Sequence, residues 1–367
     1  MLFRSNTMLS ENSQTQIFNN NFRNIIINGD MSIAQRSTSV ASITGGGYYS
    51  CDRWRFDINS QGTWTQSQST DVPTGQGFAK STKLDCTTAD ASPAAGDLLT
   101  FVQKVEGQNL QYLKKGTSSA ESTTLSFWVK SNKTGTYIAE LVDSDNSRQI
   151  SKSYTISSAN TWEKKTLTFA GDTTGAFAND NARSLDIILW LGAGSNYTSG
   201  TLSTSWSSIT NANEAVGQVN LADNTANEWY VTGVQLEAGT TASEFEFLPH
   251  DVNFRRCLRY YLSYGGDNSY ETYGFGMAYS GSEALVNIPF PVPMRSSPTV
   301  STENLSSFYT RGGATAGGAP TGLVNDFSST KVGNIALSGL SSMTDKSALR
   351  LYTNNSTATR LEFSAEL

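Results

Sequence analysis

The chain has little of what most enzymes and metalloproteins depend on. Its 367 residues include one histidine, His250, and three widely spaced cysteines, Cys51, Cys86 and Cys257. A catalytic histidine has to be oriented by a third group, and zinc sites usually take several His or Cys ligands, so we expect neither kind of chemistry. The odd number of cysteines argues against a disulfide framework, and we expect three free, buried thiols.

Charge and long apolar runs are scarce as well. Asp, Glu, Lys and Arg make up 16% of the chain, where about a quarter is typical. A net charge of −6 provides no basic field for a phosphate backbone, so nucleic acid is not an expected partner. The longest apolar runs, such as 187–191, are too short to span a bilayer, which predicts no membrane insertion. Residues 1–24 lack the apolar core of a signal peptide, so we expect synthesis in a cytoplasm.

What the chain does have is Ser, Thr, Asn and Gly, whose side chains and backbones suit short strands joined by turns. In residues 125–130, Leu125, Phe127 and Val129 share one face of a predicted strand and Trp128 lies on the other. Similar patterns recur at 137–142, 166–169, 185–191 and 229–236. Several of these strands are apolar on both faces, which favours two stacked sheets. The sequence therefore predicts an all-β fold, with a jelly-roll β-sandwich over residues 25–248.

Three further segments flank this sandwich. Residues 1–24 form a polar arm that cannot fold alone, with Ile17, Phe18 and Phe22 as its anchors to a partner. Residues 249–264 predict a linker helix, in which an apolar stripe needs a packing partner. The stripe consists of Phe254, Leu258, Tyr261 and Leu262. Residues 265–367 return to short strands and turns, which predicts a second, smaller β-sandwich domain.

Two sets of motifs resemble segments that recur in tail fibres and related surface proteins of tailed bacteriophages. The first is Asn28-Gly29-Asp30-Met31-Ser32-Ile33-Ala34-Gln35-Arg36, followed by Asp52-Arg53-Trp54. The second is Arg255-Arg256-Cys257-Leu258-Arg259-Tyr260-Tyr261, followed by Pro293-Met294-Arg295-Ser296-Ser297-Pro298. Residues 25–248 also resemble the carbohydrate-binding-module jelly rolls often embedded in phage fibres, through Asn28-Gly29-Asp30, Asp52-Arg53-Trp54 and the segments 125–130, 162–169 and 231–237.

The resemblance implies a virion protein made in the host cytoplasm. It implies a homotrimer, with the helical stripe near the threefold axis as the trimer interface. The arm, through Ile17, Phe18 and Phe22, would attach the protein to other virion proteins. A structural calcium ion near Asp30 is the one metal that the resemblance suggests, and no other cofactor is expected.

Aromatic side chains indicate where such a protein could bind sugar, because sugar rings present apolar faces that stack on aromatic rings. Trp54 shares its face with Phe56 and Ile58, which predicts a core residue. If the strands of Trp128 and Trp190 line the same sheet, the two rings could form an open platform. Its other members would be Tyr48, Tyr49 and Tyr197 on adjacent loops. The alternative is that the second face of these strands is buried.

Arg53 and Arg55 flank Trp54 on the opposite face. They could form ion pairs with Asp52, Asp57 or a neighbouring subunit, or remain solvated.

We therefore expect a non-enzymatic structural protein: a homotrimeric tail fibre, spike or capsid fibre that could contact host surface glycans. One alternative is a virion depolymerase, because glycoside hydrolysis needs only two suitably placed carboxylates. Its candidates are Asp57, Glu140, Asp186 and Glu237. The other alternative is a non-viral carbohydrate-binding module.

Overall fold

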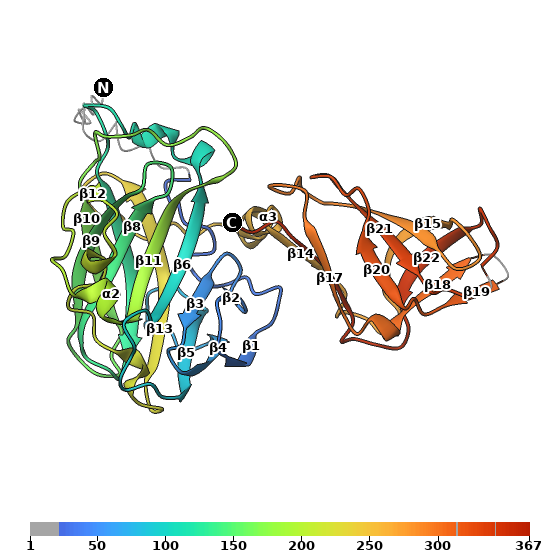
Figure 1. Cartoon of the computed structure of the whole chain (residues 1–367), viewed down its shortest axis with the longest axis horizontal. Helices are drawn as coiled ribbons and strands as arrows, with labels where there is room; N and C mark the ends of the chain where they lie inside the picture. Colours follow the sequence, from blue (N-terminus) through green and yellow to red (C-terminus); the bar gives the residue numbers. More distant parts are fainter. Residues whose placement is uncertain (1–21, 313–314, 342) are drawn as a thin grey trace, which may run out of the picture.

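The computed structural model describes residues 22–312, 315–341 and 343–367, and confirms the all-β fold. Two β-domains are joined through one short helix, and the end of the chain returns to the junction between them (Figure 1). The first domain is a sandwich of two antiparallel sheets, here called sheets A and B.

Sheet A has six strands, in the spatial order β1 (Ser39–Ile43), β4 (Thr63–Ser69), β5 (Ser81–Thr88), β13 (Glu228–Ala238), β7 (Thr123–Ser131) and β10 (Glu163–Phe169). Sheet B has seven, in the order β12 (Ser207–Ser208), β9 (Arg148–Ile156), β8 (Gly135–Asp143), β11 (Arg183–Ala193), β6 (Leu98–Glu106), β3 (Arg55–Asn59) and β2 (Gly47–Tyr48). Short helical turns lie between them: η1 (Gly107–Asn109), η2 (Gln111–Leu113), α2 (Ser195–Thr198), η3 (Asn211–Asn213) and η4 (Leu221–Asp223). The chain crosses repeatedly from one sheet to the other, as in the predicted jelly roll.

The core of the sandwich follows the predicted alternation of side chains. Leu125, Phe127 and Val129 are completely buried between the sheets. Trp54 is a core residue, as predicted, and stacks on Phe101 with ring centroids 4.9 Å apart. The three cysteines are free and buried.

The linker helix α3 (His250–Leu258) is shorter than predicted, because the chain enters strand β14 (Tyr261–Tyr264) soon after it ends. Leu258 and Leu262 pack into the core of the second domain, and Tyr261 is buried and donates to the Glu362 carboxylate. Phe254 is half-buried against the same core. The stripe is thus covered within one subunit, which corrects the prediction that it forms a trimer interface.

The second domain packs a three-stranded sheet, sheet C, against a seven-stranded one, sheet D. Sheet C runs β14, β23 (Arg360–Ser364) and β17 (Thr299–Glu303), and the turn η5 (Leu305–Ser307) follows β17. Sheet D has the order β19 (Thr315–Gly318), β18 (Phe308–Gly312), β22 (Ala348–Thr353), β15 (Thr272–Ala278), β16 (Ala284–Pro289), β21 (Val332–Ser338) and β20 (Gly322–Asn325). Phe308, Leu351 and Phe363 lie in the core between the two sheets.

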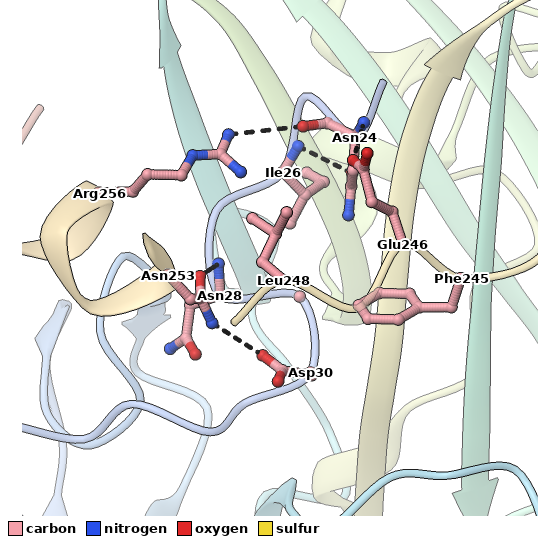
Figure 2. A pocket seen from close by; sticks show the side chains of 10 residues that line it. Asn24, Ile26, Asn28, Asp30, Phe245, Glu246, Leu248, Asn253 and Arg256 are labelled. Atoms are coloured by element: carbon pink, nitrogen blue, oxygen red, sulfur yellow. Dashed lines mark hydrogen bonds between the residues drawn. The ribbon is translucent and has the colours of Figure 1, made fainter. Parts of the chain in front are cut away.

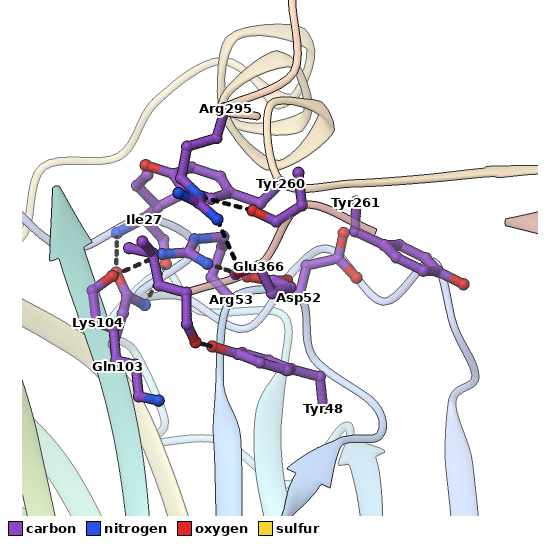
Figure 3. Close-up of polar contacts among 12 residues, drawn as sticks. Ile27, Tyr48, Asp52, Arg53, Gln103, Lys104, Tyr260, Tyr261, Arg295 and Glu366 are labelled. Atoms are coloured by element: carbon purple, nitrogen blue, oxygen red, sulfur yellow. Dashed lines mark hydrogen bonds and ion pairs between the residues drawn. The ribbon is translucent and has the colours of Figure 1, made fainter. Parts of the chain in front are cut away.

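Residues of both motif sets converge on the junction of the two domains (Figure 3). The guanidinium of Arg53 is 1% exposed, makes an ion pair with Glu366 and donates to Lys104 O at 2.6 Å. It also lies over the Tyr260 ring, 3.5 Å from the centroid. Burial alone would lower the pKa of Arg53, but the Glu366 carboxylate raises it above its ordinary value.

Neighbouring motif residues complete the junction. Arg259 donates to both carboxylate oxygens of the buried Glu106, at 2.8 and 2.7 Å. Asn28 ties the first loop together by donating to Ile33 O and Asp52 O. Arg295 donates to Ala365 O and Glu366 O, which anchors the end of the chain. The motifs therefore act as a structural joint between the domains.

We expect Glu366→Gln to lower the free energy of unfolding by about 3 kcal/mol, because it leaves the Arg53 guanidinium buried without its counter-charge. The matched control is Asp57→Asn, which removes the counter-charge of the half-exposed Arg55 and should cost less than about 1 kcal/mol. Denaturant unfolding followed by tryptophan fluorescence measures both. Equal losses of unfolding free energy in the two variants would show that the buried ion pair stabilises the fold no more than the half-exposed one.

Candidate functional site

The predicted platform of Trp128 and Trp190 does not exist, because the two residues belong to different sheets. Trp128 lies on β7 of sheet A and Trp190 on β11 of sheet B. Trp190 is 3% exposed, and its Nε1 donates to Glu140 Oε2 at 2.8 Å. Tyr197 packs on Trp190 with ring centroids 5.3 Å apart. For Trp190 the alternative of a buried second face is correct: segment 194–220 packs over it, with Tyr197 as part of that cover.

Tyr48 and Tyr49 have local structural roles instead. The Tyr48 hydroxyl donates to Leu367 O at 2.9 Å, which places Tyr48 at the domain junction (Figure 3). The Tyr49 hydroxyl donates to Gly45 O at 2.7 Å within its own loop. Neither ring joins Trp128 in a shared surface.

An aromatic surface does exist on the outer face of sheet A. Strand pairing puts Lys130 of β7 opposite Tyr230 of β13, and Tyr230 opposite Lys83 of β5. Trp162 precedes β10 and continues this row beside Lys130. Trp128 lies two residues from Lys130 on the same face, opposite Lys164. Aromatic rings and lysines therefore alternate across four strands; we call this set of six side chains the sheet A row.

Hydrogen bonds and ring contacts hold the row in place. The Lys130 ammonium lies 4.2 Å from the Tyr230 ring centroid and 5.6 Å from that of Trp162. Asp71 accepts from Lys130 and from Trp162 Nε1. On the other side, Glu228 accepts from Lys83 at 2.5 Å and from the Tyr230 hydroxyl at 2.8 Å.

These contacts shift the protonation of the acidic groups. Burial raises the pKa of Asp71, but hydrogen bonds from Lys130 and Trp162 outweigh it and hold the pKa below the ordinary value. Glu228 behaves in the same way, with Lys83 and Tyr230 as its donors. Burial, with the Glu228 contact, raises the pKa of Tyr230 to about 12. At neutral pH the row, with Asp71 and Glu228 beside it, thus combines ring faces with fixed charges of both signs.

Such a surface has the chemistry to bind a sugar chain, because the half-exposed rings of Trp128 and Trp162 offer stacking faces and the charged groups can bond hydroxyls. Sequence reasoning found Trp128 but missed Trp162 and Tyr230. The neighbourhood of these three depends on the pairing of β10, β7 and β13, which are far apart in the chain. A weak signal was present, because Tyr230 lies near the start of the predicted strand 229–236 and Trp162 opens segment 162–169 of the family resemblance.

The Asp30 region is a compact polar corner and not an open site (Figure 2). Asp30 Oδ1 accepts from Asn253 Nδ2 and from Ser32 Oγ, both at 3.1 Å. The adjoining cavity of about 10 Å³ is lined by Asn24, Glu246 and Arg256 among others and has room for about one water molecule. In the described part of the chain, Asp30 belongs to no group of three or more His, Cys, Asp or Glu side chains that could hold a metal. The calcium ion stays a prediction.

Of the predicted arm anchors, Ile17 and Phe18 lie outside the described residues. Phe22 is 59% exposed and lines an open groove of about 490 Å³ beside α3. Arg255, Arg256 and Arg259 line the same groove, together with Val252, Val292 and Pro293. The attachment role of the arm stays a prediction.

Of the four carboxylates considered for hydrolysis, Asp57, Glu140 and Asp186 lie on strands of sheet B and Glu237 lies on sheet A. Asp57 pairs with Arg55, and Asp186 with Arg183. Glu237 accepts from Ser243, on sheet A. Glu140 is buried under segment 194–220.

Comparisons with known proteins found no family model that matches this chain, and no curated protein matches it. Among solved structures, a domain of tailspike protein 4 of bacteriophage CBA120 matches with 15% identity and a TM-score of 0.31. That match covers 59% of this chain and 21% of the tailspike chain. The carbohydrate-binding module TmCBM61, solved with β-1,4-galactotriose, matches with 10% identity and a TM-score of 0.31, over 59% of this chain and 99% of the module. The family 11 carbohydrate-binding module of Clostridium thermocellum matches with 11% identity and a TM-score of 0.26. That match covers 55% of this chain and 100% of the module. None of the described helices has the length and apolar character needed to cross a membrane.

The buried carboxyl groups near Trp190 predict an unusual pH dependence of stability. Burial, with the nearby Glu214 charge, raises the pKa of Glu140 well above 4.5. Burial raises the pKa of Glu214 to about 7. Both groups bind protons more tightly in the folded than in the unfolded chain, so the free energy of unfolding should fall as the pH rises from about 4.5 to about 7.

Glu140→Gln keeps an acceptor for Trp190 but cannot ionise. We expect it to raise the free energy of unfolding at pH 7 by about 1–3 kcal/mol and to flatten this slope. Glu163→Gln is the control: burial raises its pKa, but hydrogen bonds from Lys165 and two backbone N–H groups hold the pKa below the ordinary value. Denaturant unfolding at several pH values measures the slopes. An unchanged slope in Glu140→Gln would mean that Glu140 is already ionised in the fold.

Proposed function

We propose that the protein is a structural protein of a tailed-phage virion, displayed as a homotrimeric fibre or spike, and that the outer face of sheet A contacts host surface glycans. The observation that carries the glycan part is the sheet A row. Two of its three rings, Trp162 and Tyr230, are held by hydrogen bonds to Asp71 and Glu228, so little of their side-chain freedom would be lost when a sugar chain binds.

The joint between the domains supports a display role. The motifs that resemble phage fibre segments are buried around Arg53, Glu106 and Glu366, where they bind the two domains to each other. A molecule that presents a binding face away from a particle needs such a stiff connection, since a loose linker would let the face fold back. The same position leaves Arg53, which is 1% exposed, without access to a substrate.

The proposed function is binding without cleavage. The alternative of a depolymerase would require two carboxylates acting on one glycosidic bond. Asp57 and Asp186 are each neutralised by an arginine, and Glu237 lies in the other sheet. Incubation with host surface polysaccharide should therefore release no new reducing ends, and their appearance would favour the depolymerase.

We expect Trp128→Ala and Trp162→Ala each to weaken binding to the surface polysaccharide of the host at least tenfold, or about 1.4 kcal/mol, because each removes a stacking face. A glycan array identifies the sugar, and calorimetric titration measures the affinity. Tyr112→Ala is the control, because Tyr112 is exposed but lies outside the sheet A row. Melting curves verify that the variants remain folded. Full affinity in both tryptophan variants would remove the sheet A row as the binding surface.

A further inference from the structure

The outer face of sheet D carries an apolar row that spans five strands. Strand pairing aligns Ala348 of β22, Met277 of β15, Leu285 of β16, Ala336 of β21 and Val324 of β20. The residues between them, such as Val286, Ile335 and Leu349, face the core of the domain. The central strands are therefore apolar on both faces, a pattern typical of sheets that are covered on both sides.

This apolar row is exposed in the single subunit. Phe275 and Tyr279, two residues either side of Met277, are 71% and 68% exposed. Met277 is 48% exposed and Val324 60%. Figure 1 shows sheet D at the end of the second domain away from the first domain, so the first domain does not cover it.

The exposed area is large enough for a subunit contact. A buried aromatic side chain covers about 150–250 Å², so Phe275 and Tyr279 together leave on the order of 250 Å² uncovered. With Met277, Val324 and the smaller residues the apolar row offers roughly 500 Å², the size at which a patch usually marks an interaction site. It could form the core of an interface to which each partner contributes about 800 Å².

The neighbouring row of the same face, which contains Phe275, has charges of opposite sign at its two ends. Arg311 and Arg350 lie opposite each other on β18 and β22, on one side of Phe275. Asp326, whose backbone N–H donates to Asn334 O, lies at the other side, just beyond β20. When identical faces meet around a rotation axis, the arginine side of one copy can lie beside the aspartate side of the next.

We propose that the outer face of sheet D is the surface through which copies of this chain assemble, with the apolar row inside the contact and Arg311 and Arg350 paired with Asp326 of the next copy. This rests on the proposed homotrimer and moves its interface from the helical stripe to the second domain. A second copy fits better than a sugar or a charged protein, because the centre of the face is apolar and its charges are opposite in sign at its two sides.

Light scattering during size-exclusion chromatography of the full chain at micromolar concentration tests the proposal. We expect the molar mass of the wild type to be three times the 39.6 kDa of one chain. The molar mass of Met277→Glu should be that of one chain, because the substitution would bury a charge in the apolar contact. Tyr270→Glu is the matched control, because Tyr270 is 62% exposed but lies outside both rows. Asp326→Arg should also dissociate the assembly, and adding Arg350→Asp should restore it.

A cysteine variant provides a readout that does not depend on tolerance of a new charge. The native thiols are buried, so Met277→Cys presents one reactive site, and a short bismaleimide should link subunits through it but not through Tyr270→Cys. If the wild type is trimeric but Met277→Glu stays trimeric or Met277→Cys does not link, the interface lies elsewhere and the homotrimer stands. If the wild type is a single chain, this proposal and the homotrimer both fail, while sugar binding by sheet A is judged by its own titration.

Discussion

The buried ion pair between Arg53 and Glu366 is the constraint on which the arrangement of the whole molecule depends. A guanidinium that is 1% exposed costs several kcal/mol unless it meets a counter-charge and further acceptors. Arg53 belongs to the first domain and Glu366 to the end of the chain, so the charge is satisfied only when the second domain returns its last strand to the first. The bidentate contact of Arg259 with the buried Glu106 adds a second ion pair to the junction. One buried charge thus converts two separate sandwiches into a single body.

This joint explains why the recurring motifs carry no reactive chemistry. Asn28 closes its own loop with side-chain hydrogen bonds to Ile33 and Asp52, and its carbonyl accepts from Trp54 Nε1. Arg295 holds the returning end of the chain. Asn28, Arg53 and Arg295 satisfy buried or partly buried polar groups that would be costly to leave unpaired, which constrains their identity without involving a substrate.

Local patterns predicted the fold well and the site poorly. The alternation of Leu125, Phe127 and Val129 was sufficient to predict a sandwich, because strand periodicity is a local property. It failed for Trp190 because the polar segment 194–220, which has little apolar signal, folds over that face. The helical pattern failed for Tyr261 and Leu262. Their spacing from Phe254 and Leu258 fits one face of a helix, but the chain has already entered strand β14 at these residues. Trp162 and Tyr230 were missed because only the pairing of distant strands brings them together, and a single sequence does not encode that register visibly.

The two outer sheet faces differ in the side chains that they expose, and this difference underlies the two proposals. In the sheet A row the rings alternate with lysines, and Asp71 and Glu228 hold Lys130 and Lys83, so the row remains hydrated and suited to a polar ligand that leaves it accessible. On sheet D the row through Met277 is apolar across five strands and the charges lie in the neighbouring row beside Phe275, so exposure of the apolar row to water is unfavourable in proportion to its area. The stiff joint keeps the two faces at a fixed relation. Assembly through sheet D would therefore set the directions of several sheet A faces at once, and multiple weak sugar contacts would add to a strong attachment.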